Sequence, residues 1–396
     1  MTKSMQNSHK LIFATVLFLV PISQAAIDIY SPSLPNIMKN LQTTESNVQL
    51  TISLFLVALG IGQYLYGAIS DNLGRKKTLL IGMLIFTIAS YFSYKADNIY
   101  ILIVSRFFQG LGSASIAVLS KAISVDLYAG VSLMKASAWI GLIWGVAPII
   151  APVIGGYLDE LGGWRLCFLF LTIYGFIGCL FILFFIKETL KKSEPFSING
   201  IISNSFIIVR NKDFLGSTLI VSATNLGLFV FTLMAPFFIQ VIAKKSQIYF
   251  SYLALVVGII YILGAYVSNF AVKYFEGDKV IKLVSKVLLF FGIFVLIFSV
   301  LFPFSIILLM LISCLFAFSS GFLYPFLVSR MFAPFENKAG IVSANYGIIS
   351  YAFSGLVTIL LSYISIKSVL EISIAYFIVS LITFLSSAFM FRIKIK

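Results

Sequence analysis

Apolar stretches of about 20 residues follow one another along nearly the whole chain, and each is long enough to cross a bilayer as an α-helix. Of the 396 residues, 60% are hydrophobic and 11% are charged, which is too apolar for an ordinary soluble domain. The sequence therefore predicts an all-α polytopic membrane protein. Its twelve transmembrane helices are expected at residues 11–34, 48–70, 78–95, 100–121, 136–157, 165–187, 214–240, 250–272, 283–303, 306–328, 340–363 and 369–391.

The first apolar run also has features of a secretory signal peptide. Lys10 precedes it, and Ser23-Gln24-Ala25 resembles a small-residue cleavage site. The run nevertheless continues past Ala25 to Leu34, and cleavage would leave an odd number of spans. We therefore expect a retained first span.

The net charge of +14 raises the possibility of a polyanionic partner such as nucleic acid. The basic residues are not gathered on one tail, however, but recur in short connections between the apolar runs. Most of the 28 fall on one side of the membrane if both termini are cytoplasmic. We therefore expect cytoplasmic termini and no nucleic-acid partner.

The longest polar connection separates the sixth and seventh apolar runs. We expect an N-terminal six-helix bundle at 1–190, a cytoplasmic central loop at 191–212 and a C-terminal six-helix bundle at 213–396. A weak repeat agrees with this division, because Gly67-Ala-Ile-Ser-Asp-Asn, between runs two and three, resembles Gly264-Ala-Tyr-Val-Ser-Asn, expected between runs eight and nine. Repeated bundles around a central site are typical of transporters, although a duplication without transport would leave the same pattern.

The stretch from Gly67 to Lys77 carries a tight cluster of charge between two apolar runs. We expect a short loop there. Gly67 and Gly74 would let the backbone turn, and Asp71 and Arg75 would pair or cap the helix ends. The alternative is a plain turn whose basic residues only orient the spans.

Asp28 and Arg106 are the ionisable residues that lie well inside apolar runs. Each lies about six residues from the predicted outer end of its span, so both would lie roughly 9 Å below the outer surface. Ionisable groups at such depth are costly and usually functional. We expect Asp28 to be a protonation site tuned by Arg106, with the two side chains paired or sharing a water-filled cavity. A static buried pair is the alternative.

Other polar and aromatic residues within the runs are candidates for lining that cavity. Some of them share a helix face with the two ionisable residues, at spacings of three or four residues. The candidates are Gln24, Tyr30, Gln109, Asn225 and Phe229.

The fifth run has small residues and prolines at intervals of four. Gly141 and Gly145 form one such pair, and Pro148, Pro152 and Gly156 continue the spacing. Small residues at this interval allow close helix contact, and prolines bend a helix. We expect a bent, closely packed span, with a static packing seam as the alternative.

Metal and cofactor chemistry finds little support in the sequence. The three cysteines lack paired spacing, and the single histidine, His9, lies in the N-terminal tail. We expect no metal site, no catalytic residues and no cofactor, and therefore no enzyme.

Several of these motifs together resemble the major facilitator superfamily. The stretch Gly67–Lys77 looks like its signature between spans two and three, Arg106–Gly112 like its span-four motif, and Gly145–Gly156 like the span-five motif of the drug/proton antiporter branch. Three further stretches resemble the Bcr/CflA multidrug resistance group, namely Asp28–Pro35, Lys121–Tyr128 and Ala333–Gly340. The chain departs from the family pattern at Asn72, where a basic residue is common, and at Lys121, where arginine is common.

The resemblance implies a twelve-helix exporter that works by alternating access in a bacterial inner membrane. Asp28 would be the proton- and substrate-linked acid, and Arg106 its proton-relay partner. Gly67, Asp71, Gly74 and Arg75 would form a cytoplasmic conformational lock between the two halves.

We therefore predict a proton-coupled antiporter that exports small amphiphilic compounds, powered by the proton motive force and functional as a monomer in the bilayer. One alternative is a dedicated exporter of an endogenous metabolite such as a siderophore. A nutrient symporter is another, although the span-five pattern argues against it. An intramembrane enzyme and a passive channel complete the set of alternatives.

Overall fold

The structure is a computed structural model that describes residues 3–190 and 205–391. Within these residues, twelve helices are long and apolar enough to cross a membrane, so the predicted number of spans is confirmed. The first six spans comprise α1 (Lys3–Leu19), α2 (Pro21–Asp28), the 3-10 turn η1 (Ser31–Ser33), α3 (Leu34–Asn40), α4 (Glu45–Leu73), α5 (Arg75–Lys95), α6 (Ile99–Leu127), α7 (Gly130–Gly162) and α8 (Arg165–Phe185). The last six comprise α10 (Lys212–Phe237), the π-helical turn η2 (Phe238–Ile242), α11 (Gln247–Tyr274), α12 (Gly277–Leu301), α13 (Ile306–Phe332), the turn η3 (Ala333–Lys338), α14 (Ala339–Leu361) and α15 (Val369–Phe391).

The first span is not one continuous helix but a succession of α1, α2, η1 and α3 within His9–Asn40. Prolines at 21, 32 and 35 lie at the starts of the last three pieces. Proline has no backbone N–H and cannot continue the hydrogen-bond ladder of the preceding turn, which explains the breaks. The break after α2 places Asp28 at a helix end.

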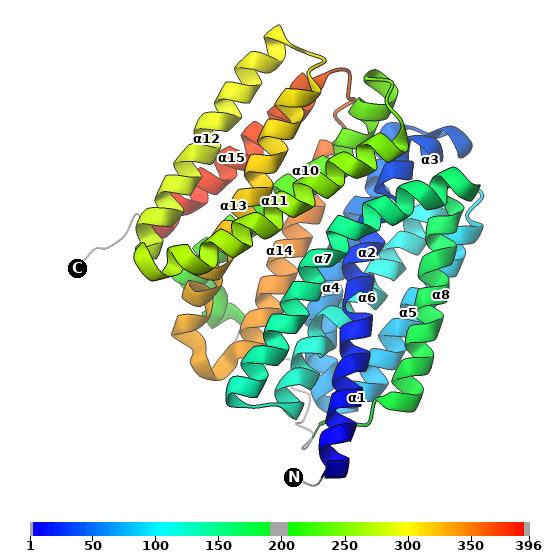
Figure 1. Cartoon of the computed structure of the whole chain (residues 1–396), viewed down its shortest axis with the longest axis vertical. Helices are drawn as coiled ribbons and strands as arrows, with labels where there is room; N and C mark the ends of the chain where they lie inside the picture. Colours follow the sequence, from blue (N-terminus) through cyan, green and yellow to red (C-terminus); the bar gives the residue numbers. More distant parts are fainter. Residues whose placement is uncertain (1–2, 191–204, 392–396) are drawn as a thin grey trace.

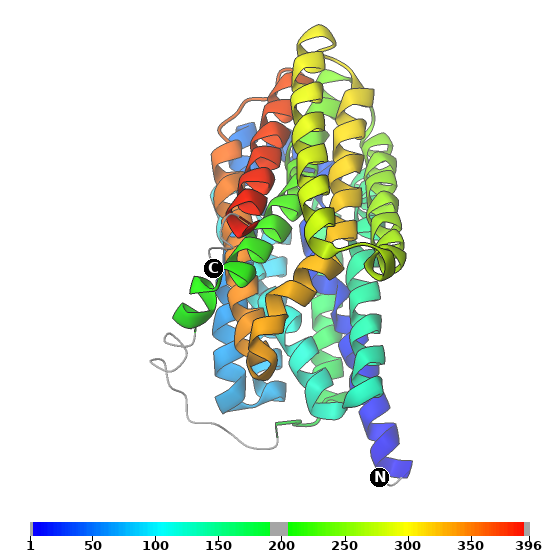
Figure 2. The same cartoon turned by 90° about the vertical axis from the view of Figure 1, so that its left-hand side faces the viewer.

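Spans from the two ends of the chain meet along two helix pairs. α4 packs against α14 and α7 against α11, while α12, α13 and α15 gather on the far side of α10 and α11 (Figure 1). The view turned by 90° shows the same helices running roughly parallel along the length of the molecule (Figure 2). At Gly60 the α4–α14 contact is so close that an added Cβ would lie 2.7 Å from the backbone nitrogen of Ala352. Close backbone approach at small residues is how membrane helices gain packing energy.

The prediction that Gly67–Lys77 forms a loop is wrong. α4 continues to Leu73 and α5 begins at Arg75, so Gly74 alone joins them. Gly74 has φ +91°, a conformation that glycine adopts readily. Asp71 ended the apolar run without ending the helix, because it lies on the last turn of α4, and the basic residues from Arg75 to Lys77 form the first turn of α5.

Gly264 was predicted to lie in a connection between two spans. This prediction is also wrong, because Gly264 lies inside α11. In the region predicted as a central loop, 191–204 lies outside the described residues, and residues 205–210 are helical.

Candidate functional site

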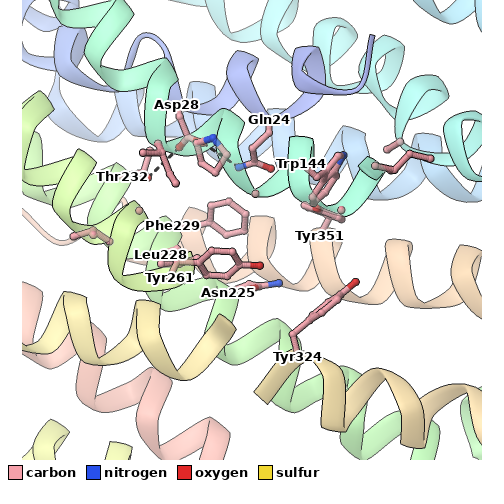
Figure 3. A pocket seen from close by; sticks show the side chains of 18 of the residues that line it. Gln24, Asp28, Trp144, Asn225, Leu228, Phe229, Thr232, Tyr261, Tyr324 and Tyr351 are labelled. Atoms are coloured by element: carbon pink, nitrogen blue, oxygen red, sulfur yellow. Dashed lines mark hydrogen bonds between the residues drawn. The ribbon is translucent and has the colours of Figure 1, made fainter. Parts of the chain in front are cut away.

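A cavity of about 450 Å³ lies between the first six and the last six spans. Its wall is formed by α2, α4, α6 and α7 from the first group and by α10, α11, α13 and α14 from the second. Figure 3 shows its side chains converging from both groups, with Asp28 and Gln24 at one edge and Tyr324 at the other. Among the residues that the structure describes, Asp28 and Lys121 are the two charged groups on this wall.

Asp28 is buried at the C-terminal end of α2 and accepts two side-chain hydrogen bonds. The amide of Gln24 donates to Oδ2 at 3.0 Å, and the hydroxyl of Thr232 donates to Oδ1 at 3.3 Å. Gln24 lies one turn earlier on the same helix, whereas Thr232 belongs to α10. The carboxyl therefore connects span one to span seven across the cavity.

Arg106 lies behind this wall and is fully buried. Its guanidinium lies between aromatic rings, 4.2 Å from the ring centre of Phe55 and 4.5 Å from that of Tyr30. One N–H group donates to Oε1 of Gln109, whose amide donates to Ser90 at 2.6 Å. Two faces of aromatic π-density stabilise a desolvated cation, so the rings take the place of a counter-ion.

The expected pairing of Asp28 with Arg106 is not found. No ion pair joins them among the described residues, and Arg106 is not on the cavity wall. The aromatic ring of Tyr30 covers the guanidinium instead. Similar depth in the membrane predicted an ion pair, but the guanidinium lies between the aromatic rings and donates to Gln109 instead.

Three of the five candidate lining residues are on the wall, namely Gln24, Asn225 and Phe229. The prediction was wrong for Tyr30 and Gln109, which are fully buried behind it. The phenol of Tyr30 forms a 2.8 Å hydrogen bond with Thr51 and packs against the arginine. Both residues support Arg106 rather than face the cavity.

The small residues of α7 divide into two groups. Gly156 lies tightly against Ser251 of α11, as the predicted close contact requires. Gly141 and Gly145 do not pack closely: a Cβ at Gly145 would have only Tyr261 nearby, at 3.8 Å, and one at Gly141 would meet nothing within 4 Å. These two glycines and Pro148 line the cavity, so the prediction of close packing is wrong for this part of α7.

Several wall residues were not predicted from the sequence. Tyr261, Tyr324, Tyr346 and Tyr351 line the side formed by the last six spans, and Trp144 faces Tyr351 with ring centres 6.4 Å apart. A signal was present, because a tyrosine inside an apolar run carries a hydroxyl that needs a polar partner or water. Lys121 was missed as a site because the predicted span ended there, whereas α6 continues to Leu127.

The charged stretch around Gly74 forms a compact cluster at one end of the bundle. The Arg75 side chain donates to Asp71 at 2.5 Å, to Ser70 at 2.7 Å and to Asp126 at 3.1 Å. Asp126 also accepts a 2.9 Å hydrogen bond from Thr189. All these partners belong to the first six spans or the segment directly after them, so these hydrogen bonds do not themselves join the two halves.

Glu188 adds a helix cap that the sequence did not reveal. Its carboxylate accepts from the backbone N–H of Arg75 at 2.8 Å and of Lys76 at 3.3 Å, at the N-terminus of α5. Partial burial raises its pKa, but backbone hydrogen bonds from Leu190, Arg75, Lys76 and Thr189 outweigh this and lower the pKa below its usual value. An added Cβ on Gly74 would collide with this carboxylate, which is a second reason for glycine there.

A second cluster with reversed charges lies in the last six spans. Arg330, near the end of α13, donates to Asp213 at 2.7 Å and also bonds Asp278 at the start of α12. In the first cluster the arginine begins span three and its acid ends span four. In the second cluster the acid begins span nine and the arginine ends span ten. The repeat therefore preserves the ion pair while exchanging its signs, which hides it from sequence comparison.

At the other end of the bundle, hydrogen bonds join the two groups of spans directly. Gln240 donates to the carbonyl of Pro32 at 2.7 Å, and Gln49 donates to the carbonyl of Leu233 at 3.4 Å. From Asp28 the cavity wall extends toward the other end of the bundle. It reaches Lys121 and Leu133, near the charge cluster around Arg75. Hydrogen bonds thus join the two groups of spans beyond Asp28. On the other side the cavity lies between them, although α4 still packs against α14 at Gly67 and Ala344.

Similarity to known proteins agrees with this architecture. The chain matches the family described as Major Facilitator Superfamily over residues 16–358. It is 36% identical over 245 residues to an uncharacterized MFS-type transporter, YdgK, of Bacillus subtilis, and 30% identical over 230 residues to a bicyclomycin resistance protein homolog of Haemophilus influenzae. These alignments cover 61% and 57% of this chain, which spans 61% and 58% of the two relatives.

The solved structure of the xylose transporter XylE from E. coli, in a partially occluded inward open conformation, has the same fold. The TM-score is 0.73 at 15% sequence identity, over 98% of both chains. With the family match over most of its length and twelve candidate spans in the described residues, the chain belongs to the Major Facilitator Superfamily, as a multi-pass membrane protein whose relatives are consistent with the Bcr/CflA drug-resistance group.

Proposed function

We propose that this protein exports small amphiphilic compounds across the bacterial inner membrane in exchange for protons. The observation that carries the proposal is the position of Asp28, an acid on the wall of a largely apolar cavity, bonded to Thr232 of the other group of spans. The similarity to a bicyclomycin resistance protein homolog supports a drug as substrate.

The carboxyl of Asp28 gives a physical route for coupling. A charged carboxylate is costly in an apolar cavity, so binding either a proton or a substrate group relieves the same cost. Protonation of Asp28 also turns the carboxylate that accepts from Thr232 into a neutral carboxyl. The charge state of Asp28 is thereby linked to the contact between the two groups of spans. One proton that moves down the membrane potential supplies about 2.3 kcal/mol per 100 mV.

Alternating access follows from the same contact. In our proposal the cavity exposes Asp28 first to the cytoplasm and then to the outside, as the groups of spans rock about the α4–α14 and α7–α11 pairs. The termini and the two charge clusters lie on the cytoplasmic side, and one chain is the functional unit. Arg106 acts as a positioning residue, which holds Tyr30 beside the α2 break rather than passing the proton itself.

The proposal is tested in everted membrane vesicles. Susceptibility profiles of deletion and overexpression strains, across antibiotics and dyes, first identify a transported compound. Adding that compound to energised vesicles should release protons when the wild type is present. Asp28→Asn should abolish this release, whereas Asp97→Asn, at an exposed connection, should leave it unchanged. Full coupled release by Asp28→Asn would overturn the assignment.

A further inference from the structure

Lys121 is a cation on the cavity wall to which the transport proposal gives no role. It lies on α6, and its exposed side chain lines the cavity together with Ala117, Ser120 and Val125. These positions fall at i, i+3, i+4 and i+8, so one helix face presents all four to the cavity. The lysine therefore points into the space that a substrate would occupy.

The ammonium group has no counter-ion among the residues that the structure describes. The nearest acid along the helix, Asp126, accepts from Arg75 at 3.1 Å and from Thr189 at 2.9 Å. Low-dielectric walls concentrate the field of a charge within a cleft, so this cation attracts an anionic ligand more strongly than a surface lysine would.

Lys121 and Asp28 line the cavity at different levels along the bundle. Arg106 contacts Tyr30, two residues after Asp28, and Lys121 follows Arg106 by 15 positions on α6. At 1.5 Å per residue this separates the two levels by about 22 Å along the helix. A small ligand held at Lys121 would leave the carboxyl of Asp28 free.

The wall that faces α6 and α7 is suited to the rest of such a ligand. Tyr261, Tyr324 and Tyr351 reach the cavity from α11, α13 and α14, and Trp144 lies beside Tyr351 (Figure 3). Aromatic rings provide flat apolar contact, and the phenols provide hydrogen bonds to a polar substituent.

We propose that Lys121 is a specificity-determining residue that binds the anionic end of an aromatic substrate, such as a carboxylate, while the aromatic part lies against Trp144 and the tyrosines. The inference rests on the proposed function only in taking this cavity as the substrate site. It selects aromatic organic anions as a substrate class, with Lys121 as a subsite separate from the proton site.

Binding to the detergent-purified full chain tests the inference without a proton gradient. Isothermal titration compares 1-naphthaleneacetate with its neutral analogue 1-naphthaleneacetamide. The wild type should bind the carboxylate more tightly. Lys121→Gln should weaken carboxylate binding about tenfold and leave amide binding within twofold, because one charged hydrogen bond is lost. Lys121→Arg should retain the preference, and Lys121→Glu should prefer the 1-naphthylmethylammonium cation.

A matched control is Lys135→Gln, which removes an equal charge from an exposed position on α7 that is not on the cavity wall. This variant should bind both probes as the wild type does. Three outcomes would overturn the inference. The wild type could bind both probes with equal affinity, Lys121→Gln could lose affinity for both probes equally, or neither probe could bind. Failure of substrate-driven proton release, in contrast, would count against the antiport proposal and not against this subsite.

Discussion

Asp28 and Thr232 are 204 residues apart in the sequence, yet the threonine hydroxyl donates a 3.3 Å hydrogen bond to the aspartate. Span one and span seven are thereby joined at the carboxyl itself. A neutral carboxyl is a weaker acceptor than a carboxylate, so protonation weakens this bond. The relationship gives a direct physical link between a proton on Asp28 and the contact between the two groups of spans.

Removing this hydrogen bond should impair coupling without abolishing it. Thr232→Val keeps the side-chain shape and removes the donor, at a cost of about 1 kcal/mol. Proton release by everted vesicles should slow by about fivefold, compared with the complete loss in Asp28→Asn. Thr224→Val is the control, because the bonds of Thr224 to described residues go to the carbonyls of Ile220 and Val221 on its own helix. Equal rates in the two threonine variants would contradict the coupling role.

Arg106 should resist even a conservative replacement. Its planar guanidinium fits between the rings of Phe55 and Tyr30, and a lysine ammonium cannot stack in this way. Arg106→Lys should destabilise the fold by about 2 kcal/mol, seen as a lower apparent melting temperature in detergent. Tyr30→Phe keeps the ring and loses only the hydroxyl, which bonds Thr51 and lies beside Arg106, so its melting temperature should fall less. A larger effect of Tyr30→Phe would argue against aromatic stabilisation of the cation.

Glu188 predicts a definite pH dependence of stability. Its pKa is lowered in the folded chain, so its charged form contributes stability above the ordinary glutamate pKa of 4.5, and this contribution is lost as the pH falls through the folded value. Glu188→Gln should therefore melt below the wild type at pH 7. Thermal denaturation at lower pH should show the two melting temperatures converging below about pH 4.5.

The control for this series is Glu276→Gln. Glu276 forms an exposed ion pair with Lys279 at 3.1 Å, so it contributes little. A gap between wild type and Glu188→Gln that widens toward acid pH would reverse the predicted sign and exclude the capping role.

Two glycines of α7 should respond differently to an added methyl group. At Gly155 a Cβ would collide with the carbonyl of Ile29, and such overpacking typically costs about 1–3 kcal/mol. At Gly145 the nearest atom would be the Tyr261 ring at 3.8 Å, so the methyl group fits within the cavity. Gly155→Ala should lower the melting temperature, while Gly145→Ala should melt as the wild type does. Equal melting temperatures of the Gly155→Ala and Gly145→Ala variants would show that α7 is not tightly packed at Gly155.

Helix number and the main ionisable candidate were predictable because each leaves a local trace in the sequence. Apolar run length specifies a span, and Asp28 is conspicuous as an acid within such a run. Helix ends were less predictable, since the charged turn around Asp71 is still helical. The second charge cluster was missed because its charges are reversed. An acid, Asp278, begins span nine where a base, Arg75, begins span three, and Arg330 ends span ten where an acid ends span four.

The class of the molecule, the number of its spans and the family signatures can all be read from the amino-acid order, because burial in lipid requires long apolar helices whatever their neighbours. The contacts between side chains of different spans became known from the fold. It placed Arg106 between aromatic rings rather than beside Asp28, left Gly145 open to the cavity, and left Lys121 facing it without a described partner. The physical reason is that these contacts depend on helix rotation and on packing between residues far apart in the chain, which hydropathy does not encode.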